Sequence, residues 1–115
     1  MITGTGVDII EIIRIRQAIE RFGEYFLKHI YTPDEITYAQ KYKFPYTHFA
    51  GRFAAKEAIY KALGDRHVTW KDMNILNDPD GKPYCILKKE NFTGKIFLSI
   101  SHSKYYAIAQ AIIEA

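Results

Sequence analysis

The chain has 115 residues, of which 48% are hydrophobic and 25% charged, and its formal net charge is +3. This size suits one globular domain and leaves no room for two. The single cysteine, Cys85, excludes an intrachain disulfide framework and suits a reducing compartment, where we expect it to fill the core. No apolar run reaches membrane-spanning length, and the mild positive charge suits an anionic ligand but is too weak to indicate nucleic acid. We therefore expect a cytoplasmic protein that binds neither a membrane nor nucleic acid.

The first half of the chain predicts one strand followed by three helices. Residues 2–9 are typical of a strand whose glycines permit close backbone approach. From about residue 11 the apolar residues recur at helical spacing, up to a glycine at 23 that is placed to end the helix. A capping box with proline at 32–35 starts a second helix, which would end at residue 41 or 42. After a connection, the third helix would run from residue 47 or 48 to Gly64.

The second half of the chain predicts strands. Residues 73–77 and 84–88 flank a turn-rich segment that is typical of a hairpin link. Two further strand-like segments lie at 96–101 and 105–113. The order predicts a single α+β domain over residues 1–115, with an N-terminal strand, about three helices and an antiparallel meander.

Two acids and a lysine point to a metal site. Glu57 and Lys61 are four residues apart on the third helix and so share one face, which could also be an ordinary surface pair worth about 0.2–0.5 kcal/mol. Asp8 interrupts apolar residues where the first strand meets the first helix, and it could simply stabilise the helix dipole. Paired with Glu57, it would instead form an oxygen site suited to Mg²⁺, which tends to borrow substrate phosphates as ligands.

The other candidate residues are less specific. His102 follows Ser99-Ile100-Ser101 at a strand end, where a lone histidine is more often structural than catalytic. The histidines and the cysteine show no zinc spacing, and a glycine-rich phosphate loop is missing. From the residues alone, the hypothesis is a phosphate ligand bridged by Mg²⁺ near Asp8 and Glu57, with Lys61 as the cation and the reaction undetermined.

Four motifs stand in order along the chain: GVDIIE at 6–11, FAGRFAAKEA at 49–58, NDPDGKP at 77–83 and SISH at 99–102. Together they resemble the holo-[acyl-carrier-protein] synthases, the short bacterial class of 4′-phosphopantetheinyl transferases, over nearly the whole chain. The resemblance implies transfer of the 4′-phosphopantetheine arm of coenzyme A to a serine of apo acyl carrier protein. It also implies release of adenosine 3′,5′-bisphosphate, a role in fatty-acid biosynthesis, and a homotrimer with active sites at the subunit interfaces.

The resemblance also implies roles for single residues. Asp8 and Glu57 would bind Mg²⁺ together with the pyrophosphate of coenzyme A. Glu57 or a metal-bound water would accept the serine proton, and Lys61 would neutralise the departing phosphate, which makes these three residues the catalytic set. Arg52 and His102 would contact the nucleotide end, at its 3′-phosphate. The loop after Gly64 is shorter than in the family, so the ribose and adenine contacts are not carried over.

A basic face on the first helix suggests a partner. Arg14, Gln17 and Arg21 are spaced three and four apart, and the resemblance implies that they contact the acidic acyl carrier protein; the alternative is a solvated helix face. A catalytically silent module that only holds coenzyme A or the carrier is the main alternative for the whole chain. Retention of Asp8, Glu57 and Lys61 argues against it. A basic RNA-binding protein is a weaker alternative, because no RNA-binding fingerprint is present.

Overall fold

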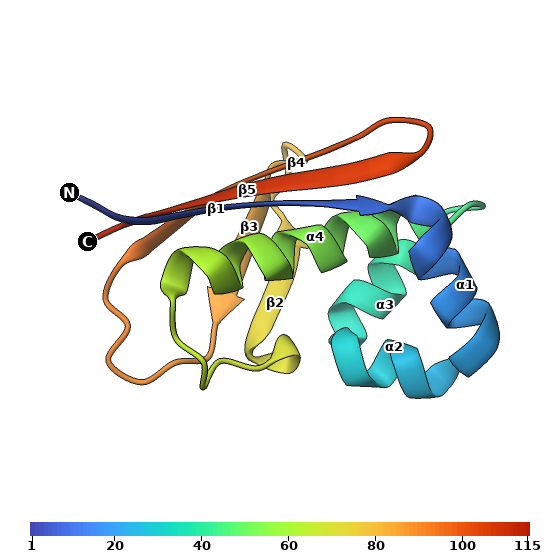
Figure 1. Cartoon of the computed structure of the whole chain (residues 1–115), viewed down its shortest axis with the longest axis horizontal. Coiled ribbons are helices and arrows are strands. Elements are labelled where there is room, and N and C mark those ends of the chain that lie inside the picture. The colour runs from blue at the N-terminus through green and yellow to red at the C-terminus, as the bar shows by residue number, and fades with distance from the viewer.

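The computed structural model describes residues 1–115, and its longest strands form a three-stranded antiparallel sheet. Its order is β1 (Ile2–Glu11), β5 (Tyr106–Glu114) and β4 (Lys95–His102), so the first strand pairs with the last. The two termini lie side by side, and the backbone N–H of Ala115 donates to the carbonyl of Met1 at 3.0 Å (Figure 1).

A separate two-stranded sheet contains β2 (Met73–Asn77) and β3 (Pro83–Leu87). The predicted α+β class and strand positions are confirmed, but the predicted meander is wrong, because the strands form two sheets and β1 joins the far end of the chain. Strand order in the sequence carries no information on such long-range pairing. Cys85 on β3 packs partly buried against the main core, and burial raises the pKa of its thiol to about 12, so the thiol stays protonated and unreactive.

Four α-helices and one short 3₁₀ turn complete the domain: α1 (Ile12–Phe22), α2 (Glu24–Ile30), α3 (Pro33–Gln40), α4 (Tyr46–Leu63) and η1 (Trp70–Asp72). Three of the helices match the predicted ones, and α2 was missed. Gly23 ends α1 at a φ of 55° as predicted, but a new helix begins directly after it, with the Leu27 N–H donating to the Gly23 carbonyl at 3.2 Å. No helix combines the length and apolar character that a bilayer-spanning segment needs.

Helix α4 is the central element, and it lies along β1 and β5 with the smaller helices at one end (Figure 1). Its alanines at 54, 55, 58 and 62 are all buried and form the main core together with inward residues of the sheet. Gly64 caps the helix in the left-handed conformation, with a φ of 67°, as its position in the sequence predicted. The small residues of α4 therefore allow strands to approach its backbone closely.

The approach of β1 to α4 depends on two glycines. A Cβ atom added at Gly4 would lie 2.0 Å from the carbonyl oxygen of Ala62, and one added at Gly6 would lie 2.0 Å from that of Ala58. Because side chains alternate across a strand, Asp8 is the next inward-facing residue after these glycines. The close packing at Gly6 therefore also sets the distance between Asp8 and α4.

Replacing Gly6 by alanine should cost about 1–3 kcal/mol of unfolding free energy or more, since the new methyl group must push the strand off α4. The measurement is urea unfolding followed by far-UV circular dichroism. Thr5→Ala is the matched control, because Thr5 is the neighbouring position and lies on the face of β1 that points away from α4. Equal stability of the two variants would show that β1 does not depend on this contact.

A buried ion pair ties the helical end of the molecule together. Lys56 Nζ lies 2.6 Å from Glu35 Oε1, and both side chains are 0% exposed. The same ammonium donates to the carbonyls of Ile30 at 2.8 Å and Trp70 at 3.0 Å, while Glu35 Oε2 accepts the N–H of Ile75 at 2.7 Å. Glu35 forms the predicted capping box of α3, but it also joins α3 to α4 and β2.

Candidate active site

The structure brings Asp8, Glu57 and Lys61 together at the contact between β1 and α4. Lys61 Nζ lies 3.2 Å from Asp8 Oδ1 and donates to the carbonyl of Val7 at 3.0 Å. The Asp8 side chain is only 16% exposed, whereas that of Lys61 is 51% exposed and can reach a ligand from the solvent side. The strand acid and the helical lysine therefore meet in a single chain, and the charges of both act on the pKa of Glu57.

The electrostatics of Glu57 are those of an acid beside a second acid. Burial raises the pKa of Glu57, the Asp8 carboxylate raises it further, and Lys61 acts in the opposite direction. The repulsion between two carboxylates favours a bound cation, which would relieve it. No group of three or more His, Cys, Asp or Glu side chains is placed to hold a metal. The chain therefore offers two carboxylates, which fits Mg²⁺ if the remaining ligands are water and phosphate oxygens.

A second, cationic cluster surrounds Arg52, which is only 5% exposed. The guanidinium lies over the ring of Tyr38, 4.0 Å from its centre, and donates to the side-chain oxygen of Asn77. Its Nε is buried and has no hydrogen-bond partner. Asn77 in turn donates to the carbonyl of Gly81 at 2.8 Å, so Arg52 is connected to the hairpin link that carries the NDPDGKP motif.

Two histidines belong to the same cluster. His102 ends β4 in register with Ala107, on the side of the sheet that faces α4. His48 lies one helical turn before Arg52 and stacks on Tyr42 with ring centres 3.7 Å apart. Burial lowers the pKa of His48, and the charges of Arg52 and His102 lower it further, which places all three groups near one another. His48 was given no role from sequence, although its spacing of four from Arg52 was available as a signal.

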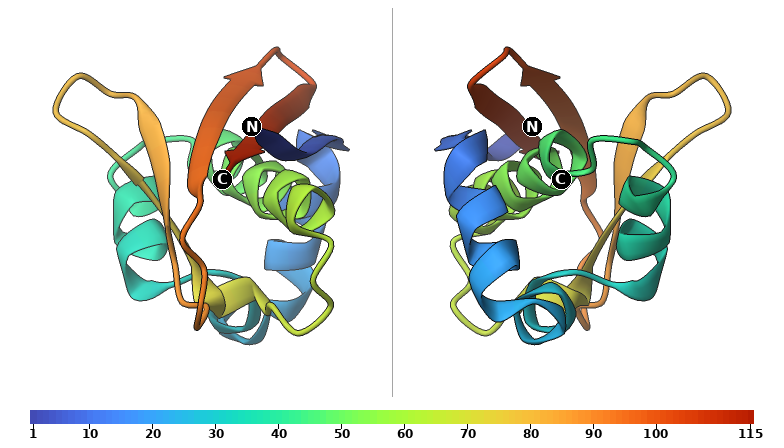
Figure 2. Two further views of the ribbon diagram at one scale, coloured as in Figure 1. Left: turned by 90° about the vertical axis from the view of Figure 1, so that its left-hand side faces the viewer. Right: turned by 90° about the vertical axis from the view of Figure 1, so that its right-hand side faces the viewer.

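The two clusters lie on opposite flanks of α4. Arg52 and Glu57 are five positions apart on α4, so their side chains point in directions that differ by about 140° around the helix axis. Arg52 faces α3 and β2, whereas Glu57 faces β1 and η1. Figure 2 shows α3 and the β2–β3 hairpin on one side of α4 and β1 on the other. The predicted nucleotide contacts at Arg52 and His102 are therefore not brought to the acidic pair within one chain.

The basic face of α1 is free of ion pairs. Arg14, Gln17 and Arg21 are all exposed, and none of the three takes part in a salt bridge. Arg16 and Glu20 instead pair with each other at 3.3 Å on a neighbouring part of the helix surface. The three residues are thus exposed and free of salt bridges, and their contact with a carrier protein stays a prediction.

Comparison with known proteins gives one consistent result. Residues 4–111 match the family model described as the 4′-phosphopantetheinyl transferase superfamily. The chain is 50% identical to the holo-[acyl-carrier-protein] synthase of Clostridium tetani, over 99% of this chain and 97% of that protein, and 46% identical to that of Chlorobaculum tepidum, over 95% and 96%.

Solved structures agree with the sequence relatives. The fold matches a Bacillus anthracis holo-(acyl-carrier-protein) synthase in complex with CoA (3′,5′-ADP) at a TM-score of 0.88 and 40% identity, covering 100% of this chain and 98% of that one. It also matches the Helicobacter pylori synthase in complex with coenzyme A at a TM-score of 0.87 and 32% identity, covering 96% and 99%.

Proposed function

Because the chain belongs to the holo-[acyl-carrier-protein] synthases of the 4′-phosphopantetheinyl transferase superfamily, we propose a Mg²⁺-dependent group transfer as its function. The enzyme moves the 4′-phosphopantetheine group of coenzyme A to a serine of apo acyl carrier protein and releases adenosine 3′,5′-bisphosphate. The observation that carries the Mg²⁺ dependence is the Asp8–Lys61 ion pair, beside which the Asp8 carboxylate raises the pKa of Glu57. We place the reaction in fatty-acid biosynthesis in the cytoplasm, which the free thiol of Cys85 suits.

Asp8, Glu57 and Lys61 would each have a different role in the transfer. The serine oxygen forms a new bond to the phosphorus that carries the pantetheine arm, and the bond from that phosphorus to the bridging oxygen of the diphosphate breaks. A bound Mg²⁺, held by Asp8 and Glu57, would supply neutralisation of the diphosphate charge. Glu57 or a water beside it would accept the serine proton. Lys61 would hold Asp8 in place and meet the negative charge that develops on the departing bisphosphate.

A homotrimer with shared sites accounts for the two separate clusters. The outer face of the main sheet is unusually apolar: Val7 and Ile9 are 55% and 60% exposed, and Phe97, Tyr106 and Ile108 on β4 and β5 are at least 40% exposed. Such a face supports association with further copies of the chain. In a ring, the acidic pair of one copy would face the Arg52 and His102 cluster of its neighbour, and coenzyme A would bridge the two.

A mass-shift assay tests the proposed function. Mixing the protein with coenzyme A, Mg²⁺ and an apo acyl carrier protein should increase the carrier's mass by one phosphopantetheine. The alternative, a binding module that holds coenzyme A or the carrier without reaction, would leave the carrier's mass unchanged. That result would refute the transfer.

Charge reversal on α1 tests the carrier surface. Arg14→Glu should raise the KM for acyl carrier protein about tenfold at low salt and leave the KM for coenzyme A unchanged, because surface charges of this kind mainly guide encounter with an acidic partner. The effect should shrink as salt is added. Arg16→Glu is the matched control, with the same change of net charge at a residue that pairs with Glu20. If the two variants behave alike, Arg14 has no specific role.

A further inference from the structure

His48 lies in the first turn of α4, one helical turn before Arg52, and it is half-buried. Its ring stacks on Tyr42 with the ring centres 3.7 Å apart, and it meets the ring of Tyr38 edge to face with the centres 5.5 Å apart. The Arg52 guanidinium lies over the same Tyr38 ring, 4.0 Å from its centre. Contact with Tyr38 therefore holds the imidazole and the guanidinium close to each other.

The charged groups that act on His48 are all cationic. They are Arg52 from its own helix and His102, when protonated, from the end of β4, and no carboxylate acts on the ring. Tyr38 of α3 and Tyr42, just after it, are the titratable groups in ring contact. Burial lowers the pKa of His48, and the two cations lower it further. The positive end of the α4 dipole also disfavours a proton there. The imidazole is therefore neutral at pH 7 in the free chain.

The cluster lacks an acceptor for its donors. Arg52 is 5% exposed, and its Nε is buried without a hydrogen-bond partner. Glu35, a carboxylate whose charge acts on Arg52, is already paired with Lys56 at 2.6 Å. The ring nitrogens of His48 make no hydrogen bond within the chain, and neither is buried. A phosphate monoester beside Arg52 would supply both an acceptor and a negative charge, which favours the protonated imidazole.

We propose that His48 takes up a proton when the 3′-phosphate of the donor binds beside Arg52, so that affinity for the 3′-phosphorylated donor increases as the pH falls. This rests on the proposed function, which places that phosphate at Arg52 and His102. The proton comes from the buffer, and the new N–H donates to a phosphate oxygen. The contribution is full below the pKa of His48 in the free chain. It disappears as the pH rises through the higher pKa of His48 in the complex.

Calorimetric titration in two buffers with different enthalpies of ionisation measures the protons taken up on binding. At pH 7 in Mg²⁺, binding of coenzyme A should take up at least about half a proton more in the wild type than in His48→Phe. The phenylalanine keeps a ring against Tyr42 but cannot be protonated. Dephospho-coenzyme A, which lacks the 3′-phosphate, should give the same uptake in both proteins. Equal uptake with coenzyme A in both proteins would overturn the proposal.

The pH dependence of affinity gives a second readout. The dissociation constant for coenzyme A in His48→Phe, divided by that of the wild type, should increase about fivefold or more from pH 8 to pH 6. Ionisation of the phosphate itself and of His102 occurs in both proteins, so these effects cancel in the ratio. A ratio that stays constant between pH 6 and pH 8 would mean that His48 only packs against its neighbours, which contradicts the proposal.

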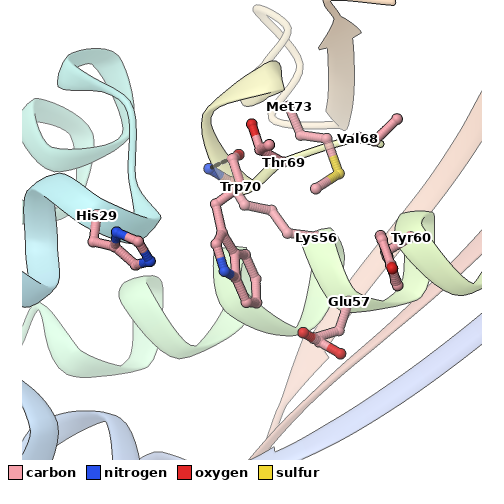
Figure 3. A pocket seen from close by; sticks show the side chains of 8 residues that line it. All are labelled: His29, Lys56, Glu57, Tyr60, Val68, Thr69, Trp70 and Met73. Carbon is pink, nitrogen blue, oxygen red and sulfur yellow. Dashed lines mark hydrogen bonds between the residues drawn. The ribbon is translucent and has the colours of Figure 1, made fainter. Parts of the chain in front are cut away.

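His29→Phe is the matched control, with the same chemical change at a histidine that also stacks on a tyrosine, Tyr25. His29 and Glu57 line a cavity of about 360 Å³ between α2, α4 and η1, on the flank of α4 away from Arg52 (Figure 3). This variant should keep the wild-type difference in proton uptake between coenzyme A and dephospho-coenzyme A. Its loss would show that the effect is not specific to His48. Failure of the proposed function would look different, because the wild type would then transfer no phosphopantetheine at any pH.

Discussion

Glu57→Gln should lower the turnover of phosphopantetheine transfer by at least about a thousandfold, as measured by the gain in carrier mass over time. The amide has the same shape but carries no charge, so it can neither hold a divalent cation with Asp8 nor accept a proton. The loss should appear in kcat, because neutralisation of the diphosphate matters most while the bond to the leaving group breaks.

The same substitution should leave the fold intact or stabilise it slightly. Burial and the Asp8 carboxylate raise the pKa of Glu57, so the folded chain prefers its neutral form. At a pH above that pKa the charged form carries an unfavourable energy that a neutral glutamine does not. Glu90→Gln, at an exposed position away from the site, is the control with the same chemical change. A Glu57→Gln variant with full activity would remove the residue from the mechanism.

Two inactive variants should restore activity when they are combined. Arg52→Ala removes the cationic cluster and Glu57→Gln removes the acidic pair, and each alone should be strongly impaired. If each site takes one cluster from one copy and the other from its neighbour, a mixed ring contains some sites with both clusters intact. Random mixing of equal amounts predicts about one quarter of the wild-type sites. Co-expression followed by the mass-shift assay measures this.

Complementation separates a shared site from a site within one chain. If one chain supplied all the residues, every site in the mixture would lack Arg52 or Glu57, and activity would stay at the level of the weaker variants. The structure favours sharing, because Arg52 and Glu57 face opposite flanks of α4. Co-expression of the two single variants Glu57→Gln and Asp8→Asn is the control. Both changes fall in the same cluster, so neither variant should restore the activity of the other.

The local features of the fold could be predicted from sequence, and the long-range ones could not. Capping residues and helical periodicity place α1, α3 and α4 within one or two residues of their observed ends, because these signals act within a turn. Helix α2 was missed because Gly23 is both the end of one helix and the start of the next. The pairing of β1 with β5 joins residues at opposite ends of the chain and leaves no local signal.

The candidate site shows the same division. The acidic pair could be inferred because Asp8 is a charged residue in an apolar strand and Glu57 lies on a helix crowded with alanine. The Glu35–Lys56 pair could not, since a capping box already explained Glu35 locally, and its buried partner is 21 residues away on another helix. The separation of Arg52 from Glu57 could have been foreseen, because a spacing of five does not place two side chains on one face.

The most direct test is calorimetric titration of coenzyme A into three proteins: the wild type, Asp8→Asn and Glu57→Gln. Each titration is carried out in Mg²⁺ and in EDTA. The comparison shows whether the two acids hold a cation jointly with the donor's diphosphate. Mg²⁺ should tighten binding to the wild type about tenfold or more and should have no effect on either variant. An equal Mg²⁺ effect in all three proteins, or none in the wild type, would contradict the account.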